Sequence, residues 1–155
     1  MIADYETILV PTDGSDEVDR ALSHALRLAT DHGATVHALY VVDGRVLKAA
    51  SENRESVAAD LRGRGEDAVD RVRARAADAG LDCVAAVREG TPDVAIREYA
   101  DEVGADVVVM APRGLSGRDR LQSLGSVTER VVEVAARPVF VVGGESADEE
   151  ASASG

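Results

Sequence analysis

Short apolar runs alternate with stretches of helical periodicity along almost the whole chain. Two of the runs, ILV at 8–10 and VVVM at 107–110, are continuous, as in strands that are covered on both faces of a parallel sheet. Strands that alternate with helices are usually joined by parallel crossovers. The pattern predicts an α/β fold with an open parallel sheet, whose five strands are expected at 7–10, 35–42, 83–87, 106–110 and 139–142.

Four stretches carry apolar residues at helical spacing, and glycines mark where several of them end. Gly33, Gly80 and Gly104 each follow such a stretch, and glycine readily adopts the left-handed conformation that closes a helix. Gly63 and Gly65 fall inside the second stretch, where each costs about 1 kcal/mol relative to alanine, so this helix is expected to be kinked or split. The four helices are predicted at about 18–29, 57–76, 94–103 and 127–135.

Length and cysteine content narrow the class of protein. The 155 residues suggest one domain, predicted over 1–143, and Cys83 is the only cysteine, which excludes intrachain disulfides and favours a reducing, cytoplasmic location. The segment GGESADEEASASG is acidic and lacks periodicity, so residues 144–155 are predicted to be a disordered tail. No apolar run approaches the roughly 18 residues of a membrane span, so no membrane partner is expected.

The charge balance is strongly acidic, with 17 Lys and Arg against 29 Asp and Glu, a formal net charge of −12. Such a chain repels nucleic acid phosphates, so nucleic acid is not an expected partner. Lys48 is the only lysine. Abundant carboxylates with almost no lysine also suit a halophile-like surface that stays soluble in concentrated salt, which is a hypothesis for the melting temperature to test.

The first candidate site follows the first predicted strand, where Pro11, Thr12, Asp13, Gly14 and Ser15 lead into a helix. In open parallel sheets, ligands bind beyond the carboxyl ends of the strands, at the point where strand order reverses. Asp13 is suited to hold a ribose hydroxyl or a nucleotide-bound magnesium ion, and Thr12 and Ser15 can donate hydrogen bonds. The alternative is that Ser15, or the aspartate after it, simply caps the helix.

The second candidate site follows the fourth predicted strand, where three glycines precede a helix. Gly114, Gly117 and Gly125 allow main-chain N–H groups to approach an anion, and the helix N-terminus adds partial positive charge. Residues 113–120 carry three arginines against one aspartate, a local reversal of the chain's charge. These features predict a phosphate site. Ser126, with Glu129 three residues later, also fits a capping box, which would explain this serine without a ligand.

At these residues the chain resembles the universal stress protein family, over nearly its whole length from 8 to 142. The resemblance implies a five-stranded parallel sheet of order 3-2-1-4-5 with helices on both faces, of the adenine nucleotide alpha hydrolase-like kind. It also implies a homodimer built partly on the last strand, and ATP in the cleft between strands 1 and 4. The matching segments are ILVPTDGS at 8–15, LYVVD at 39–43, REGTPDVAI at 88–96, GADVVVMAPRGLSG at 104–117 and GSVTERVV at 125–132.

The resemblance also implies which residues meet the nucleotide. The adenine and ribose end is expected at Pro11, Thr12, Asp13 and Val41, and the phosphates at Gly114, Gly125, Ser126 and Val127. The expected set is completed by Met110, Arg113, Gly117 and Thr128, with magnesium bound through the nucleotide beside Asp13. The implied strand order places an apolar stretch at the sheet edge, where pairing with a second copy is expected through Val139, Phe140, Val141 and Val142.

Three functions stay open on the sequence. The first is a small regulatory stress-response protein in which ATP biases conformation or the binding of an unknown protein partner. The second is a dimeric interaction module of the same fold without nucleotide, favoured by Ala111 in place of the family's first glycine and by a loop one residue longer between Gly114 and Gly125. The third is a slow ATP-hydrolysing enzyme; phosphoryl transfer needs a base and a metal clamp, and only Asp13 offers itself for either role.

Overall fold

The structure is a computed structural model that describes residues 2–114 and 124–143. All five predicted strands and all four predicted helices are present, together with a short helix, α2, that the hydrophobic pattern did not predict. Gly117 and the predicted acidic tail lie outside the described residues. The elements are β1 (Thr7–Pro11), α1 (Asp16–His32), β2 (Thr35–Asp43), α2 (Gly44–Ala49), α3 (Arg54–Asp78), β3 (Cys83–Gly90), α4 (Pro92–Val103), β4 (Val107–Met110), α5 (Ser126–Val134) and β5 (Val139–Val141).

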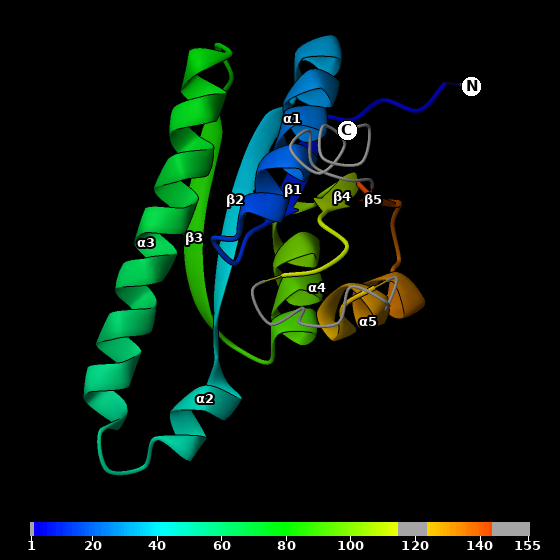
Figure 1. Cartoon of the computed structure of the whole chain (residues 1–155). Helices are drawn as coiled ribbons and strands as arrows, with labels where there is room; N and C mark the ends of the chain where they lie inside the picture. The colour runs from blue at the N-terminus through cyan, green and yellow to red at the C-terminus, as the bar shows by residue number, and fades with distance from the viewer. Residues whose placement is uncertain (1, 115–123, 144–155) are drawn as a thin grey trace, which may run out of the picture.

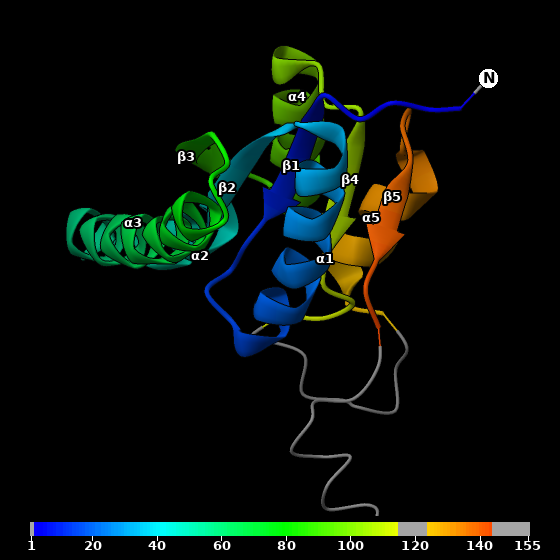
Figure 2. The same ribbon diagram turned by 90° about the horizontal axis from the view of Figure 1, so that it is seen from above.

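The five strands form one fully parallel sheet in the order β3-β2-β1-β4-β5, which confirms the expected topology (Figure 1). Helices α1 and α3 cover one face of the sheet, and α4 and α5 cover the other (Figure 2). Side chains of each central strand alternate between the two layers: Ile8 and Val10 point toward α1, and Leu9 points toward α4. None of the described helices combines the length and apolar character needed to cross a bilayer.

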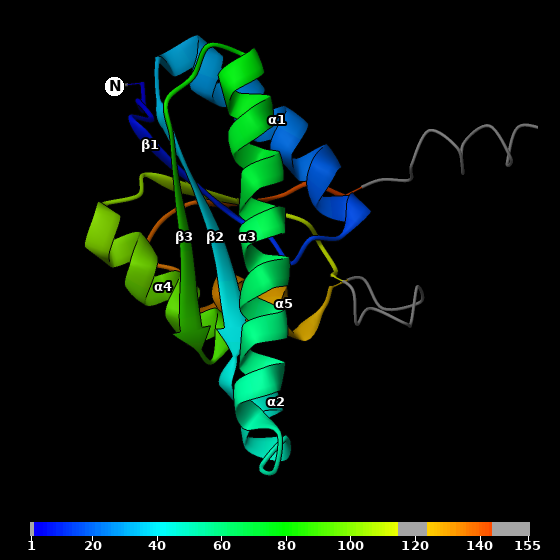
Figure 3. The ribbon, with the colours of Figure 1, turned by 90° about the vertical axis from the view of Figure 1, so that its left-hand side faces the viewer.

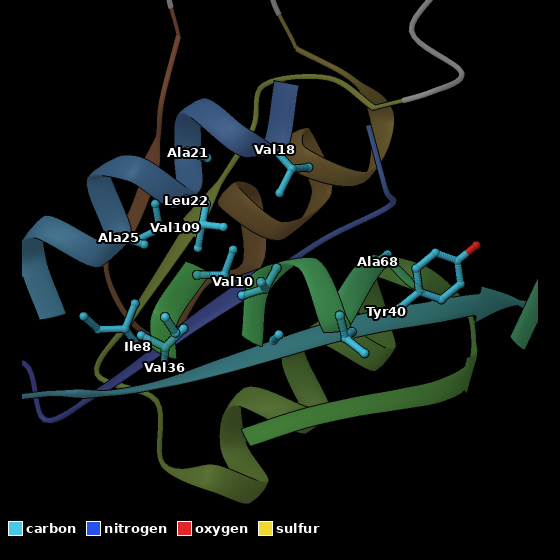
Figure 4. Packing of buried hydrophobic residues seen from close by; sticks show 14 of the residues in the cluster. Ile8, Val10, Val18, Ala21, Leu22, Ala25, Val36, Tyr40, Ala68 and Val109 are labelled. Atoms are coloured by element: carbon cyan, nitrogen blue, oxygen red, sulfur yellow. The ribbon is translucent and has the colours of Figure 1, made fainter. Parts of the chain in front are cut away.

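The layer between the sheet and α1 is built from small and branched side chains. Ala21 and Ala25 are fully buried, so the helix backbone lies close to the strands, and Leu22 fills the space above Val10 and Val109 (Figure 4). Burying a side chain such as Leu22 stabilises the fold by about 1.5–3 kcal/mol relative to leaving it exposed. This layer fixes the start of α1, and with it the loop that follows β1.

Glycines end helices as predicted, but they do not divide α3. Gly33 and Gly104 adopt the left-handed conformation at the ends of α1 and α4, with φ of 65° and 66°. Helix α3 runs unbroken through Gly63 and Gly65, so the predicted split was wrong. Gly65 faces the ring of Tyr40, and a Cβ there would lie 2.5 Å from a ring carbon. The glycine therefore serves close packing of α3 on β2.

The start of α5 also differs from its prediction. The residue before the helix is Gly125, and Ser126 is the first helical residue, so the predicted capping box at Ser126 was wrong. The N–H of Gly125 donates to the Pro112 carbonyl at 2.7 Å, and the Gly125 carbonyl accepts from Glu129 at 2.9 Å. These two bonds make Gly125 the N-cap of α5, one residue before the serine that the capping-box pattern indicates.

Strands β2 and β3 are longer than their neighbours, and this shapes the carboxyl edge of the sheet. The pairing of β1 with β2 ends at Pro11 and Leu39, whereas β2 and β3 stay paired as far as Asp43 and Gly90. In Figure 3 these two strands continue past β1 toward α2, flanked by α3. The far part of β2 therefore borders the end of β1 with one edge unpaired.

Candidate functional site

The chain leaves β1 and β4 in opposite directions at the carboxyl edge of the sheet. These strands are neighbours, and β1 continues into α1 on one face while β4 leads to α5 on the other. This is the reversal point at which open α/β sheets bind ligands. The loops after β1 and β4 lie there side by side, so the two segments singled out in the sequence are brought together.

The loop after β1 is held by its own hydrogen bonds. Thr12 is buried, and its N–H donates to the Leu39 carbonyl at 2.8 Å. The hydroxyl of Thr12 accepts from the N–H of Gly14 at 3.1 Å, and Oδ1 of Asp13 accepts from the N–H of Ser15 at 3.0 Å. Gly14 has a φ of 82°, which other residues rarely adopt. The Asp13 carboxylate is thus oriented by the turn itself.

Ser15 occupies the N-cap position of α1, but its side chain makes no capping bond. Its hydroxyl is buried in a residue only 7% exposed and has no hydrogen-bond partner among the described residues. The purely structural explanation for Ser15, a side-chain cap, is therefore wrong. A buried polar group without a partner costs about 1–3 kcal/mol, so a ligand that supplied one would gain from this loop.

The loop after β4 approaches Asp13 closely. A Cβ added to Gly114 would lie 1.9 Å from Oδ2 of Asp13, so position 114 has no room for a side chain beside this carboxylate. The base of the loop is tied by the Gly125–Pro112 bond and by the buried Thr128 hydroxyl, which donates to the Ala111 carbonyl at 2.9 Å. Every described non-glycine residue has negative φ, so alanine is unstrained at 111.

Helix α5 begins at this edge, and its first main-chain donors have no partner among the described residues. The first-turn N–H groups of Ser126, Val127 and Thr128 have no partner within the helix, and no side chain of a described residue caps them. The helix dipole adds partial positive charge at the same point. Amides in this arrangement bind phosphate or other anions.

The unpaired edge of β2 presents a further donor and acceptor. The Leu39 carbonyl and the Thr35 N–H bond toward β1, whereas the Val36 N–H bonds toward β3. Main-chain groups alternate sides along a strand, so the N–H and C=O of Val41 point to the side where β1 has already ended. Neither group is bonded by any part of the chain that the structure describes.

The charges named around the edge lie on the face of the sheet that α1 and α3 cover. Nε of Arg113 lies 3.8 Å from a carboxylate oxygen of Glu17 in α1. Burial raises the pKa of Tyr40, the positive charge of Arg64 lowers it, and the Asp13 carboxylate raises it again. Tyr40 therefore lies within electrostatic reach of Asp13, on the α3 side of the edge. The other predicted arginines of the 113–120 segment lie outside the described residues.

Most of the predicted site residues meet at this edge. Asp13 and Gly114 are in direct proximity, Gly125 and the residues after it start α5, and Gly117 lies outside the described residues. Val41, Met110 and Val127 belong to one apolar cluster on the α4–α5 side, Pro11 and Thr12 are buried at the end of β1, and Arg113 lies beside α1. Sequence reasoning missed Arg71, whose Nη1 donates to the Gly14 carbonyl at 3.3 Å from 57 residues away.

The chain is similar in sequence and in fold to known proteins. A model of the universal stress protein family matches residues 4–143. Universal stress protein MJ0531 of Methanocaldococcus jannaschii is 38% identical over 140 residues, covering 89% of this chain and 82% of that protein. The structure of hypothetical protein MJ0577, from the same archaeon, has a TM-score of 0.83 at 28% identity, covering 94% of this chain and 100% of that one. A universal stress protein in complex with cAMP has a TM-score of 0.63 at 32% identity, covering 90% and 98%.

Proposed function

The chain belongs to the universal stress protein family, and from this premise we propose that it binds an adenine nucleotide, ATP or a close relative, beyond the carboxyl ends of β1 and β4. The relative in complex with cAMP supports an adenine nucleotide as the class of ligand. The observation that carries the proposal is the free main-chain edge of β2 at Val41, beside the oriented carboxylate of Asp13. The two features supply partners for a base and for a ribose.

Adenine fits the donor and acceptor at Val41. Its N1 accepts a hydrogen bond and its N6 amino group donates one, which matches one main-chain N–H and one C=O on the same strand edge. Guanine presents the opposite pattern, with a donor at N1 and an acceptor at O6. The apolar cluster that contains Val41, Met110 and Val127 provides the surface against which a base would lie.

Ribose and phosphates follow from the two loops. Asp13, whose Oδ1 is held by Ser15, accepts from a ribose hydroxyl, with Pro11 and Thr12 forming the floor. The phosphates lie on the first-turn amides of α5 and along the main chain at Gly114 and Gly125. Arg113 and Gly117 contribute as the local positive charge and the glycines of the sequence predict. Thr128 supports this segment through its bond to Ala111 and donates its hydroxyl proton there.

Magnesium is expected to arrive with the nucleotide. Among the described residues, no group of three or more His, Cys, Asp or Glu side chains is arranged to hold a metal ion. Asp13 is the carboxylate that would reach a magnesium ion, whose other ligands would be phosphate oxygens and water. The donor set at this edge fits such a shared ion, and bound magnesium would neutralise phosphate charge there.

The role that these features support is regulation by occupancy rather than turnover. The nucleotide would join the loops after β1 and β4, so that ATP biases the conformation of this edge and the binding of a protein partner. Asp13 is engaged by the turn and is proposed to meet the ribose, which leaves it poorly placed as a base for an attacking water. Any ATP hydrolysis is expected to be slow.

Isothermal titration calorimetry with Mg-ATP and Mg-GTP tests the proposal. We expect ATP to bind at least about 10-fold more tightly, because GTP would leave the Val41 donor and acceptor mismatched. Val41→Pro removes one N–H without breaking a bond to β1 or β3, and should weaken ATP binding by a similar factor, whereas the control Val41→Ala should not. Equal affinity for ATP and GTP, or equal loss in both variants, would refute this mode of base recognition.

Mass spectrometry of nucleotide released from freshly purified, denatured protein distinguishes the three functions. Near-stoichiometric ATP supports the nucleotide-regulated protein. If no nucleotide is released and millimolar ATP gives no heat, the module without nucleotide is preferred. Sustained release of ADP or AMP, at rates on the order of 1 s⁻¹, would instead identify an enzyme.

We also propose that residues 1–143 form the working domain of a cytoplasmic homodimer. Strand β5 pairs only with β4 among the described strands, and Phe140 in it is 40% exposed, so this edge offers main-chain groups and apolar surface to a second copy. Val139 and Val141 in the strand, and Val142 after it, are half-buried. A sedimentation mass equal to one 16.2 kDa chain across the micromolar range would exclude the dimer.

A further inference from the structure

The guanidinium of Arg71, on α3, bonds to Gly14 in the loop before α1 and to Asp19 in the first turn of α1. Its Nη2 donates to both carboxylate oxygens of Asp19, at 3.0 and 2.8 Å, and its Nη1 donates to the Gly14 carbonyl at 3.3 Å. The guanidinium is planar, so bonds from two of its nitrogens, Nη2 to Asp19 and Nη1 to Gly14, together restrict its orientation. Arg71 thus connects the outer helix α3 with the loop that carries Asp13.

One peptide group transmits this contact to Asp13. The Gly14 carbonyl that accepts from Arg71 belongs to the same peptide plane as the Ser15 N–H, and that N–H donates to Oδ1 of Asp13 at 3.0 Å. A peptide plane is rigid, so its orientation is set at both edges together. Hydrogen bonds in series also polarise one another, so a cation on the carbonyl strengthens the N–H as a donor.

The rest of the α3 surface keeps this relay in register. A Cβ at Gly14 would lie 3.6 Å from the Cβ of Ala68, which is three residues before Arg71 on α3. Gly65, three residues before Ala68, packs against Tyr40. The stripe of Gly65, Ala68 and Arg71 on α3 therefore contacts the end of β2 and the loop after β1. Gly14, with its positive φ, sits between the stripe and Asp13.

From this geometry we infer that Arg71 is a positioning residue for the nucleotide site, acting through the Gly14–Ser15 peptide to hold the Asp13 carboxylate toward the ribose. The inference rests on the proposed function. Arg71 does not touch the nucleotide; it restricts the freedom of a carboxylate that does. Without it, the Gly14–Ser15 peptide is held less firmly and Asp13 is less well ordered before binding, and completing that order costs a measurable part of the affinity.

A ligand pair separates this role from a merely structural one. Both ATP and 2′,3′-dideoxy-ATP carry the same base and phosphates, but only ATP has the ribose hydroxyls that Asp13 would accept from. The dissociation constant of dideoxy-ATP divided by that of ATP, both measured by calorimetry on one protein sample, reports the Asp13–ribose contact. This ratio cancels general losses of stability or folded fraction. We expect Arg71→Met to lower this ratio by about 5-fold through weaker ATP binding, with dideoxy-ATP nearly unaffected.

Arg75→Met is the matched control. Arg75 also joins α3 to α1, donating to the Asp19 carbonyl at 3.1 Å and to the Ser23 hydroxyl at 2.9 Å, and neither bond reaches the loop. This variant should keep the wild-type ratio while losing comparable thermal stability. Asp19→Ala, which releases the guanidinium from its other partner, should lower the ratio in the same direction as Arg71→Met.

The outcomes are distinguishable. An unchanged ratio in Arg71→Met and Asp19→Ala, or an equal fall in Arg75→Met, would overturn the positioning role while leaving nucleotide binding intact. A wild-type protein that binds neither ligand would overturn the proposed function, and this inference with it. A fall confined to Arg71→Met and Asp19→Ala would support both.

Discussion

The narrow space between Gly114 and Asp13 gives a direct test of the site. In Gly114→Ala, the new Cβ would lie 1.9 Å from Oδ2 of Asp13, which is 1.5 Å short of the 3.4 Å at which ordinary contact begins. The φ of Gly114 lies outside the left-handed region, so alanine suits the main chain there. The clash is therefore relieved by rotating the flexible carboxylate away, at the expense of its 3.0 Å bond from Ser15.

The magnitude follows from the contact that would be lost. A hydrogen bond to a charged group contributes about 1.5–3 kcal/mol, so displacing Asp13 from the ribose should weaken ATP binding by about 10- to 150-fold. Calorimetric titration measures this loss, and circular dichroism should show an unchanged fold. The control is Gly63→Ala, whose Cβ meets no atom within 4 Å on α3. Wild-type ATP affinity in Gly114→Ala would refute the assignment of Asp13 to the nucleotide.

Four further substitutions or conditions test separate parts of the structure. Gly125→Val should abolish nucleotide retention with the circular dichroism spectrum intact, because a Cβ there makes only 3.5 Å contacts with the protein; unchanged affinity would remove Gly125 from the site. Gly65→Ala should lower the free energy of unfolding by about 1–3 kcal/mol by overpacking against Tyr40, whereas an unchanged value would show that α3 can shift. Burial lowers the pKa of His37 from its usual 6.5, so its neutral form stabilises the fold. That contribution should be complete above pH 6.5 and fall as the pH drops below it, and urea titrations of wild type and His37→Gln that show parallel pH profiles would contradict this. The acidic composition predicts a melting temperature that rises in molar potassium chloride, and an unchanged value would contradict it.

The sequence predicted the regular core of the fold well because its signals are local. The continuous apolar runs at 8–10 and 107–110 are fully buried strands, and glycines stand at the ends of α1 and α4 as expected. The same local reasoning failed at Ser126, where a bond from Gly125 to Pro112 decides the helix start. It also failed at Gly65, because the Tyr40 ring that the glycine accommodates comes from β2.

The candidate site likewise combines residues that local sequence motifs predict with one residue that they do not. Asp13, Gly114 and Gly125 stand in motifs next to strands, so their meeting at one edge follows from the parallel topology. Arg71 is one of several arginines on an exposed helical face, and nothing in its local sequence distinguishes it. Its contact with Gly14 depends on how α3 packs across the sheet, 57 residues along the chain. Such partners are found only when the helices have been placed.

The extra length of β2 has a consequence for how the protein can change over time. Every amino acid except proline carries the same peptide donor and acceptor, so the hydrogen-bonding character of position 41 does not depend on the residue found there. A base preference that depends on these main-chain groups is set by the lengths of β1 and β2, because those lengths leave the groups unpaired. Point mutations other than to proline would leave it untouched, and the insertion or deletion of a strand residue would be needed to rewrite it.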